Sequence, residues 1–192
     1  MRGPVVAVVL AMTMATAACS GSSSKATKAS TTTVAIATTS TSALSSTTTA
    51  GSTSPVSVAP TQPTAHLVAV RAARQGTSDR VVFEFSDRVP GYKIAYTSER
   101  LSDTAGRQVT VTGSATLLVR MESAGGFNLD TGKPTYTGPK QVQPTGTQAV
   151  QQLVQVDDFE GVLRWAIGVR GQVGFKVSTL TSPARLVIDV GS

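Results

Sequence analysis

The sequence predicts an all-β fold, an antiparallel β-sandwich of about eight strands, preceded by a signal peptide and a disordered Ser/Thr-rich linker. Apolar residues alternate with polar residues at a period of two in several short stretches, which is typical of half-buried strands. No stretch carries the sustained apolar stripe and caps of an amphipathic helix. All aromatic residues lie between Phe83 and Phe175, so we expect one hydrophobic core in the C-terminal two thirds of the 192-residue chain.

Residues 1–18 are predicted to be an export signal. Arg2 supplies a positive charge, and the apolar run from Val5 to Ala18 ends in small residues. That run is shorter than the roughly 20 apolar residues that a membrane-spanning helix needs. It matches the apolar centre of a signal peptide instead.

The residues around Cys19 indicate lipidation. The sequence Thr16-Ala17-Ala18-Cys19 resembles the lipobox of bacterial lipoproteins, in which the cysteine is lipidated and becomes the first residue. The resemblance implies a protein anchored to the cell membrane on its extracytoplasmic side. The alternative is a secreted protein that is cut near Ala18 and keeps Cys19 as a free thiol. Because secreted proteins rarely keep an odd cysteine, we favour lipidation.

Residues 19–64 are expected to form a disordered linker. Ser and Thr supply 25 of the 45 residues from 20 to 64, and this stretch has no aromatic and no acidic residue. It carries too little apolar surface to offset the entropy lost on ordering. We therefore expect a tether between the anchor and the folded domain.

Residues 65–192 are expected to form the β-sandwich. Trp165 shares one face of its strand with apolar neighbours, so we assign it to the core rather than to sugar stacking. The one stretch compatible with a helical turn is 148–153. Predicted strands cover residues 67–71, 81–86, 93–96, 108–112, 115–121, 153–157, 163–170, 173–178 and 185–190.

A long irregular segment, Ser123–Thr147, is the candidate binding site. It contains five Gly and three Pro, and loops of this length inside a compact domain are usually functional or mobile. Phe127 and Tyr136 offer flat apolar surfaces, and Lys133 and Lys140 offer cations for carboxylates or phosphates. The alternative is an insertion that contacts no ligand.

Three stretches resemble a known family: Arg80–Ser86 with Pro90–Lys93, Asp158–Val162, and Pro183–Val190. Together they resemble the AMIN-like domain found behind lipoprotein signals in actinobacteria, a relative of the AMIN domain of cell-wall amidases and secretin-type envelope proteins. The resemblance covers residues 65–192. It implies a non-catalytic domain that binds peptidoglycan or another component of the cell envelope.

The composition excludes several kinds of site. One Cys and one His cannot build a multi-Cys zinc site, a His metal cluster or an intrachain disulfide. Asp157, Asp158 and Glu160 could serve calcium binding or acid–base catalysis, but they lack the spacing of a calcium loop. We therefore expect no metal, no cofactor and no catalytic residue. A hydrolase acting on wall material is the less favoured alternative.

The charge pattern bears on the partners. The net charge is +6, and no run of Lys or Arg with interleaved aromatic residues suggests nucleic-acid binding. The expected partners are the membrane, through the lipid anchor, and peptidoglycan. An accessory role, in which the domain binds another envelope protein, is the alternative.

Overall fold

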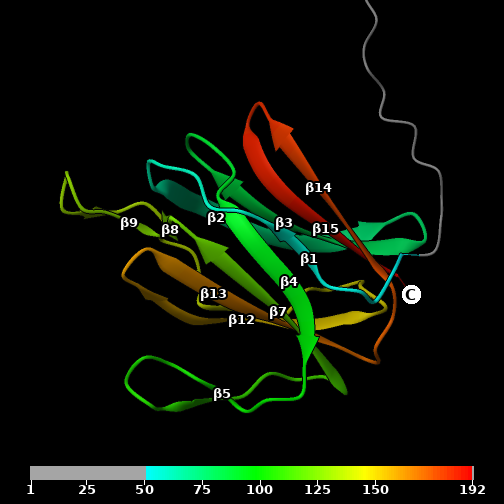
Figure 1. Ribbon diagram of the computed structural model, residues 1–192. Helices are drawn as coiled ribbons and strands as arrows, with labels where there is room; N and C mark the ends of the chain where they lie inside the picture. Colours follow the sequence, from blue (N-terminus) through cyan, green and yellow to red (C-terminus); the bar gives the residue numbers. More distant parts are fainter. Residues whose placement is uncertain (1–50, 192) are drawn as a thin grey trace, which may run out of the picture. The chain divides into compact units, whose positions relative to one another are not determined.

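The computed structural model describes residues 51–191, which form two β-sheets packed face to face (Figure 1). The predicted signal peptide, Cys19 and the linker up to residue 50 lie outside these residues. No helix is present in the described range, so no helix there could cross a membrane.

The first sheet has six strands, and every neighbouring pair is antiparallel. Its central strands are β7 and β13, which run side by side over their whole length. The strands, in spatial order, are β1 (Val56–Val58), β4 (Gly91–Thr97), β7 (Ala115–Glu122), β13 (Val162–Val169), β12 (Val150–Phe159) and β11 (Gln141–Val142).

The second sheet has five strands. Its pairs are antiparallel except for β2 and β8, which run parallel. In spatial order they are β14 (Phe175–Thr181), β15 (Ala184–Gly191), β3 (Ser78–Phe85), β2 (Ala65–Gln75) and β8 (Ala124–Gly125). Two small ribbons complete the fold, β5 (Leu101–Ser102) with β6 (Gln108–Val109), and β9 (Phe127–Asn128) with β10 (Lys133–Pro134).

The predicted fold class is confirmed. Within residues 51–191, eight strands are seven residues or longer: β2, β3, β4, β7, β12, β13, β14 and β15. The strand predicted at 108–112 shrinks to the two residues of β6. The helical turn considered at 148–153 is wrong, because β12 begins at Val150 and the N–H groups of Gln148, Ala149 and Val150 all donate to a side chain of the other sheet.

The core lies between the two sheets. Trp165 of β13 is fully buried, as predicted, and meets Phe83 of β3 edge to face with ring centroids 5.9 Å apart. Tyr96 of β4 meets Phe175 of β14 in the same way at 6.0 Å. Each of these pairs joins one sheet to the other. Burying a large apolar side chain contributes about 1.5–3 kcal/mol, so these inward faces dominate the stability of the sandwich.

A second, smaller apolar cluster covers the outer face of the six-stranded sheet. Ala166 follows the inward-facing Trp165 and therefore points to the opposite face. There it packs with Val156 and with Leu101, which the β5–β6 ribbon carries over the sheet. This ribbon therefore covers part of the outer face of the six-stranded sheet.

The ordered part of the chain begins before the predicted boundary at Ala65. Val56 of β1 pairs with Ile94, so residues assigned to the linker extend the first sheet. Pro60 packs so closely on Gly91 that a Cβ there would lie 2.3 Å from the Pro60 Cα atom. Composition does not reveal this strand because β1 is only three residues long and pairs through backbone hydrogen bonds, which any residue except proline can supply.

Candidate functional site

The segment Ser123–Thr147 is organised rather than irregular. Its start, β8, adds to the edge of the second sheet, and its end, β11, adds to the edge of the first sheet. Between them, β9 and β10 form a short ribbon that projects from the sandwich (Figure 1). The segment is therefore attached to one sheet near its start and to the other sheet near its end.

Tyr136 fixes the middle of this segment to the core. Its half-buried ring meets Trp165 edge to face, with centroids 5.8 Å apart and an interplanar angle of 86°. Its hydroxyl donates a hydrogen bond to the Pro139 carbonyl oxygen at 2.7 Å. Burial raises the pKa of the Tyr136 hydroxyl, which keeps it protonated as a donor. Tyr136 thus holds the segment against the core, and only the exposed part of its side chain is available to a ligand.

Asp158 ties the segment to β12. Its Oδ2 atom accepts the Gly126 N–H at 2.8 Å, and the Gly126 carbonyl accepts the N–H groups of Thr135 and Tyr136. Partial burial raises the pKa of the Asp158 carboxyl, the Gly126 N–H opposes that rise, the charge of Asp157 adds to it and the charge of Lys140 opposes it. Asp158 was a candidate acid from the sequence, and in the structure it holds the loop.

The other predicted binding residues lie on the exposed side of the segment. Phe127 is 44% exposed on β9, and Lys133 lies exposed on β10, where it pairs with Asn128. Lys140 is exposed beside β11, and its carbonyl oxygen accepts the Gln155 N–H at 2.8 Å. Leu129, which the sequence reasoning did not select, is 87% exposed at the ribbon tip. Phe127 and Lys133 therefore share one ribbon, whereas Lys140 and Tyr136 lie closer to the sandwich.

The three carboxylates of the acidic stretch have separate roles. Asp157 accepts from the Arg164 guanidinium through both of its oxygens. Asp158 holds Gly126, and Glu160 occupies the turn between β12 and β13 with a positive φ of 50°. In the described residues, no three His, Cys, Asp or Glu side chains gather in a way that could hold a metal ion.

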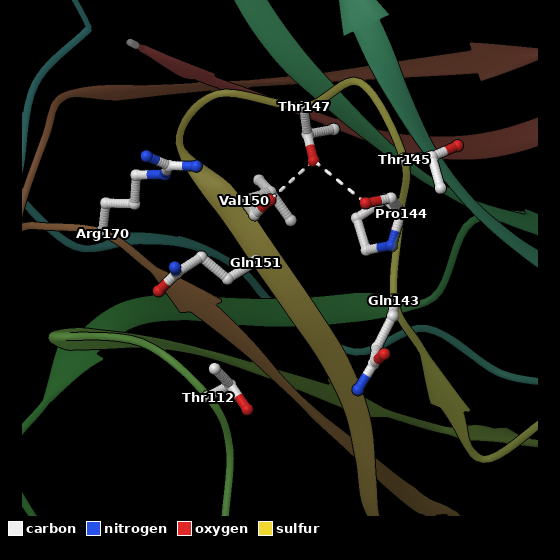
Figure 2. A pocket seen from close by; sticks show the side chains of 8 residues that line it. All are labelled: Thr112, Gln143, Pro144, Thr145, Thr147, Val150, Gln151 and Arg170. Atoms are coloured by element: carbon white, nitrogen blue, oxygen red, sulfur yellow. Dashed lines mark hydrogen bonds between the residues drawn. The ribbon is translucent and has the colours of Figure 1, made fainter.

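A polar groove, which the sequence reasoning missed, lies at the start of β12. Its volume is about 430 Å³. Figure 2 shows its side chains gathered around the first residues of β12, with Gln151 and Arg170 on one side of the strand. The lining includes Thr112, Gln143, Pro144, Thr145, Gln151 and Arg170. Because these residues come from three separate segments, no local sequence pattern could have indicated the groove.

Comparison with known protein families identifies the folded domain. The model of the family described as the AMIN-like domain matches residues 65–192. No curated protein and no solved structure matches this chain.

Proposed function

Because this chain belongs to the AMIN-like domain family, which indicates an extracytoplasmic domain of the cell envelope, we propose that it is a membrane-anchored, non-catalytic lipoprotein that binds peptidoglycan. The family match covers the folded domain. We further infer the lipid anchor, the peptidoglycan ligand and the non-catalytic role from the features described below.

The anchor rests on Cys19. The thiol follows an apolar run and two alanines, and it is the only cysteine of the chain. Two or three acyl chains on this residue would hold the protein stably at a membrane. The Ser/Thr-rich residues after Cys19 would then act as a spacer between the membrane and the domain.

One observation carries the binding proposal: Tyr136 packs on Trp165 and so fixes a segment whose outer side exposes Phe127, Lys133 and Lys140. The Phe127 ring can stack on the apolar face of a sugar. The lysines can pair with carboxylates of the peptide part of peptidoglycan. A segment held by both sheets loses little entropy on binding.

A second candidate function is supported by the exposed apolar side chains of the same ribbon. Leu129 is 87% exposed next to Phe127, and apolar residues at a projecting tip are typical of protein-binding surfaces. In this case the partner would be another envelope protein. A wall hydrolase has weaker support, because the clustered carboxylates hold Arg164 and Gly126 rather than facing one cleft.

The test is co-sedimentation of the full chain with purified peptidoglycan, run beside a pull-down from envelope extract. We expect wild type to sediment with peptidoglycan, and Phe127→Ala to reduce the bound fraction severalfold. Leu180→Ala is the matched control, because Leu180 is also partly exposed, at 39%, but lies on β14. Absence of sedimentation together with recovery of one defined protein from the extract would support the accessory function instead.

A further inference from the structure

Two buried polar side chains hold the walls of the groove in Figure 2. Among residues 51–191, the polar or charged residues that are buried are Asp79, at 0% exposure, and Gln152, at 7%. Burying such groups is costly unless hydrogen bonds compensate them. Asp79 through its Oδ2 atom and Gln152 through its Oε1 atom accept backbone N–H groups of residues that line or adjoin the groove, so the groove is a built feature of the fold.

Asp79 holds the first wall. Its Oδ2 atom accepts the N–H groups of Gln148, Ala149 and Val150 at 2.8, 2.6 and 2.9 Å. Next to them, the Thr147 hydroxyl donates to the Val150 carbonyl oxygen at 2.7 Å (Figure 2). These bonds fix the segment that carries Thr145 and Pro144 into the groove.

Gln152 and Gly168 hold the second wall. The Gln152 Oε1 atom accepts the Thr112 N–H at 2.7 Å. The Thr112 carbonyl lies so close to β13 that a Cβ at Gly168 would be 1.9 Å from its oxygen, so only glycine fits there. The Arg170 N–H donates to the Ala149 carbonyl oxygen at 2.9 Å, which joins the third segment to the first wall.

The groove offers one cation and several neutral hydrogen-bonding groups. Arg170 is the charged residue that lines it, and no acidic residue does. Several other arginines of the described chain pair with carboxylates, as Arg80 does with Asp189 through two bonds of 2.7 and 2.8 Å. Arg170 forms no ion pair with a carboxylate in residues 51–191. Its guanidinium is therefore free to bind an external anion.

We propose that this groove binds a short peptide with a free carboxylate, which Arg170 recognises. A guanidinium matches a carboxylate with two parallel hydrogen bonds. The side-chain amides of Gln143 and Gln151 can each donate to a peptide carbonyl and accept from a peptide N–H. A volume of about 430 Å³ accommodates a few residues. The proposal rests on the proposed function only in taking the peptide part of peptidoglycan as its source.

Calorimetric titration of the full chain tests this with three probes: acetyl-D-Ala-D-Ala, its C-terminal carboxamide, and glucuronate. We expect wild type to bind the carboxylate peptide at least about tenfold more tightly than the carboxamide, since the two differ only in the charge-assisted pair. We expect Arg170→Gln to lose about the same factor and Arg170→Lys to be intermediate. Arg100→Gln is the control, because Arg100 is an exposed arginine outside the groove, and it should bind like wild type.

The proposal is overturned by no binding of the carboxylate peptide, by equal binding of the carboxamide, or by unchanged binding by Arg170→Gln. Stronger binding of glucuronate than of the peptide also overturns it, since the groove would then select acidic sugars. The wild-type comparison of carboxylate with carboxamide decides even if a variant fails to fold. Sedimentation with intact peptidoglycan judges the proposed function separately, so peptidoglycan binding without peptide binding would remove this proposal alone.

Discussion

The Asp79 carboxylate on β3 accepts the backbone N–H of Ala149 at 2.6 Å, and this bond ties the five-stranded sheet to the segment that leads into β12 of the six-stranded sheet. The same oxygen accepts two further N–H groups, and Arg74 donates to the other oxygen at 3.2 Å. A buried carboxylate with this many donors is compensated, but the loss of its charge leaves the donors poorly satisfied.

We predict that Asp79→Asn destabilises the protein by about 2–4 kcal/mol, because the amide keeps the size of the side chain but replaces one acceptor oxygen by an N–H group among backbone donors. The measurement is the free energy of unfolding in urea. Asp130→Asn, at an exposed position in the ribbon, should stay within about 0.5 kcal/mol of wild type. Equal urea midpoints of unfolding for the two variants would show that the contacts of Asp79 between the sheets do not stabilise the protein.

Much of the sandwich could be predicted from the sequence because its strands alternate. β3 shows this pattern, with Val81, Phe83 and Phe85 all buried on one face. Asp79 lies in the same phase as these residues, two positions before Val81, and this is the signal that could have marked it as a buried polar residue. Because Asp79 is polar, a period-two pattern counted over apolar residues alone does not detect it.

The candidate site was harder to predict because its contacts join distant residues. Tyr136 and Trp165 are 29 positions apart, and the wall of the groove at Thr112 is fixed by Gln152, 40 positions away. The composition of residues 123–147, rich in Gly and Pro, indicated a loop, and much of this segment does lie outside the long strands. It could not indicate which ring of the loop packs on the core, because apolarity alone favours Phe127 over Tyr136, whereas Tyr136 is the ring that contacts Trp165.

Substitutions of the two aromatic rings of the segment, Tyr136 and Phe127, should differ in their effect on the stability of the protein. We predict that Tyr136→Ala costs about 2–4 kcal/mol, because it leaves a cavity beside Trp165. Tyr136→Phe should cost about 1 kcal/mol, since it removes only the hydrogen bond to Pro139. Phe127→Ala should change stability by less than about 1 kcal/mol because that ring is already 44% exposed. Thermal unfolding of the three variants gives the comparison, and a large loss for Phe127→Ala would place its ring in the core.

The anchor makes a prediction that does not depend on the binding site. Cys19→Ala removes the thiol that would carry the lipid, so we expect the protein to leave the membrane fraction, either as released protein or as an uncut precursor. Fractionation with an immunoblot against the folded domain is the measurement. Ser20→Ala, the neighbouring position, serves as the control and should remain at the membrane. If both variants fractionate like wild type, the protein is held by something other than Cys19.

We predict that the contribution of Asp158 to the free energy of unfolding depends on pH with the opposite sign to that of a salt-bridged carboxylate. Its pKa is raised from 3.8, first by partial burial, against the opposing Gly126 N–H. The folded state therefore binds this proton more tightly than the unfolded state, and the Asp158 contribution to stability falls as pH rises through the raised pKa.

Asp158→Asn keeps an oxygen for the Gly126 N–H without the charge, so we expect it to equal or exceed wild type in stability at pH 7. The advantage should shrink as pH falls and vanish below the unfolded pKa of 3.8, where wild type is protonated in both states. Urea unfolding of both proteins between pH 3 and 7 measures this difference, with Asp130→Asn as the exposed control that should show no such trend. A variant that is less stable at pH 7 and gains on wild type as pH falls would mean that the charged form of Asp158 stabilises the loop.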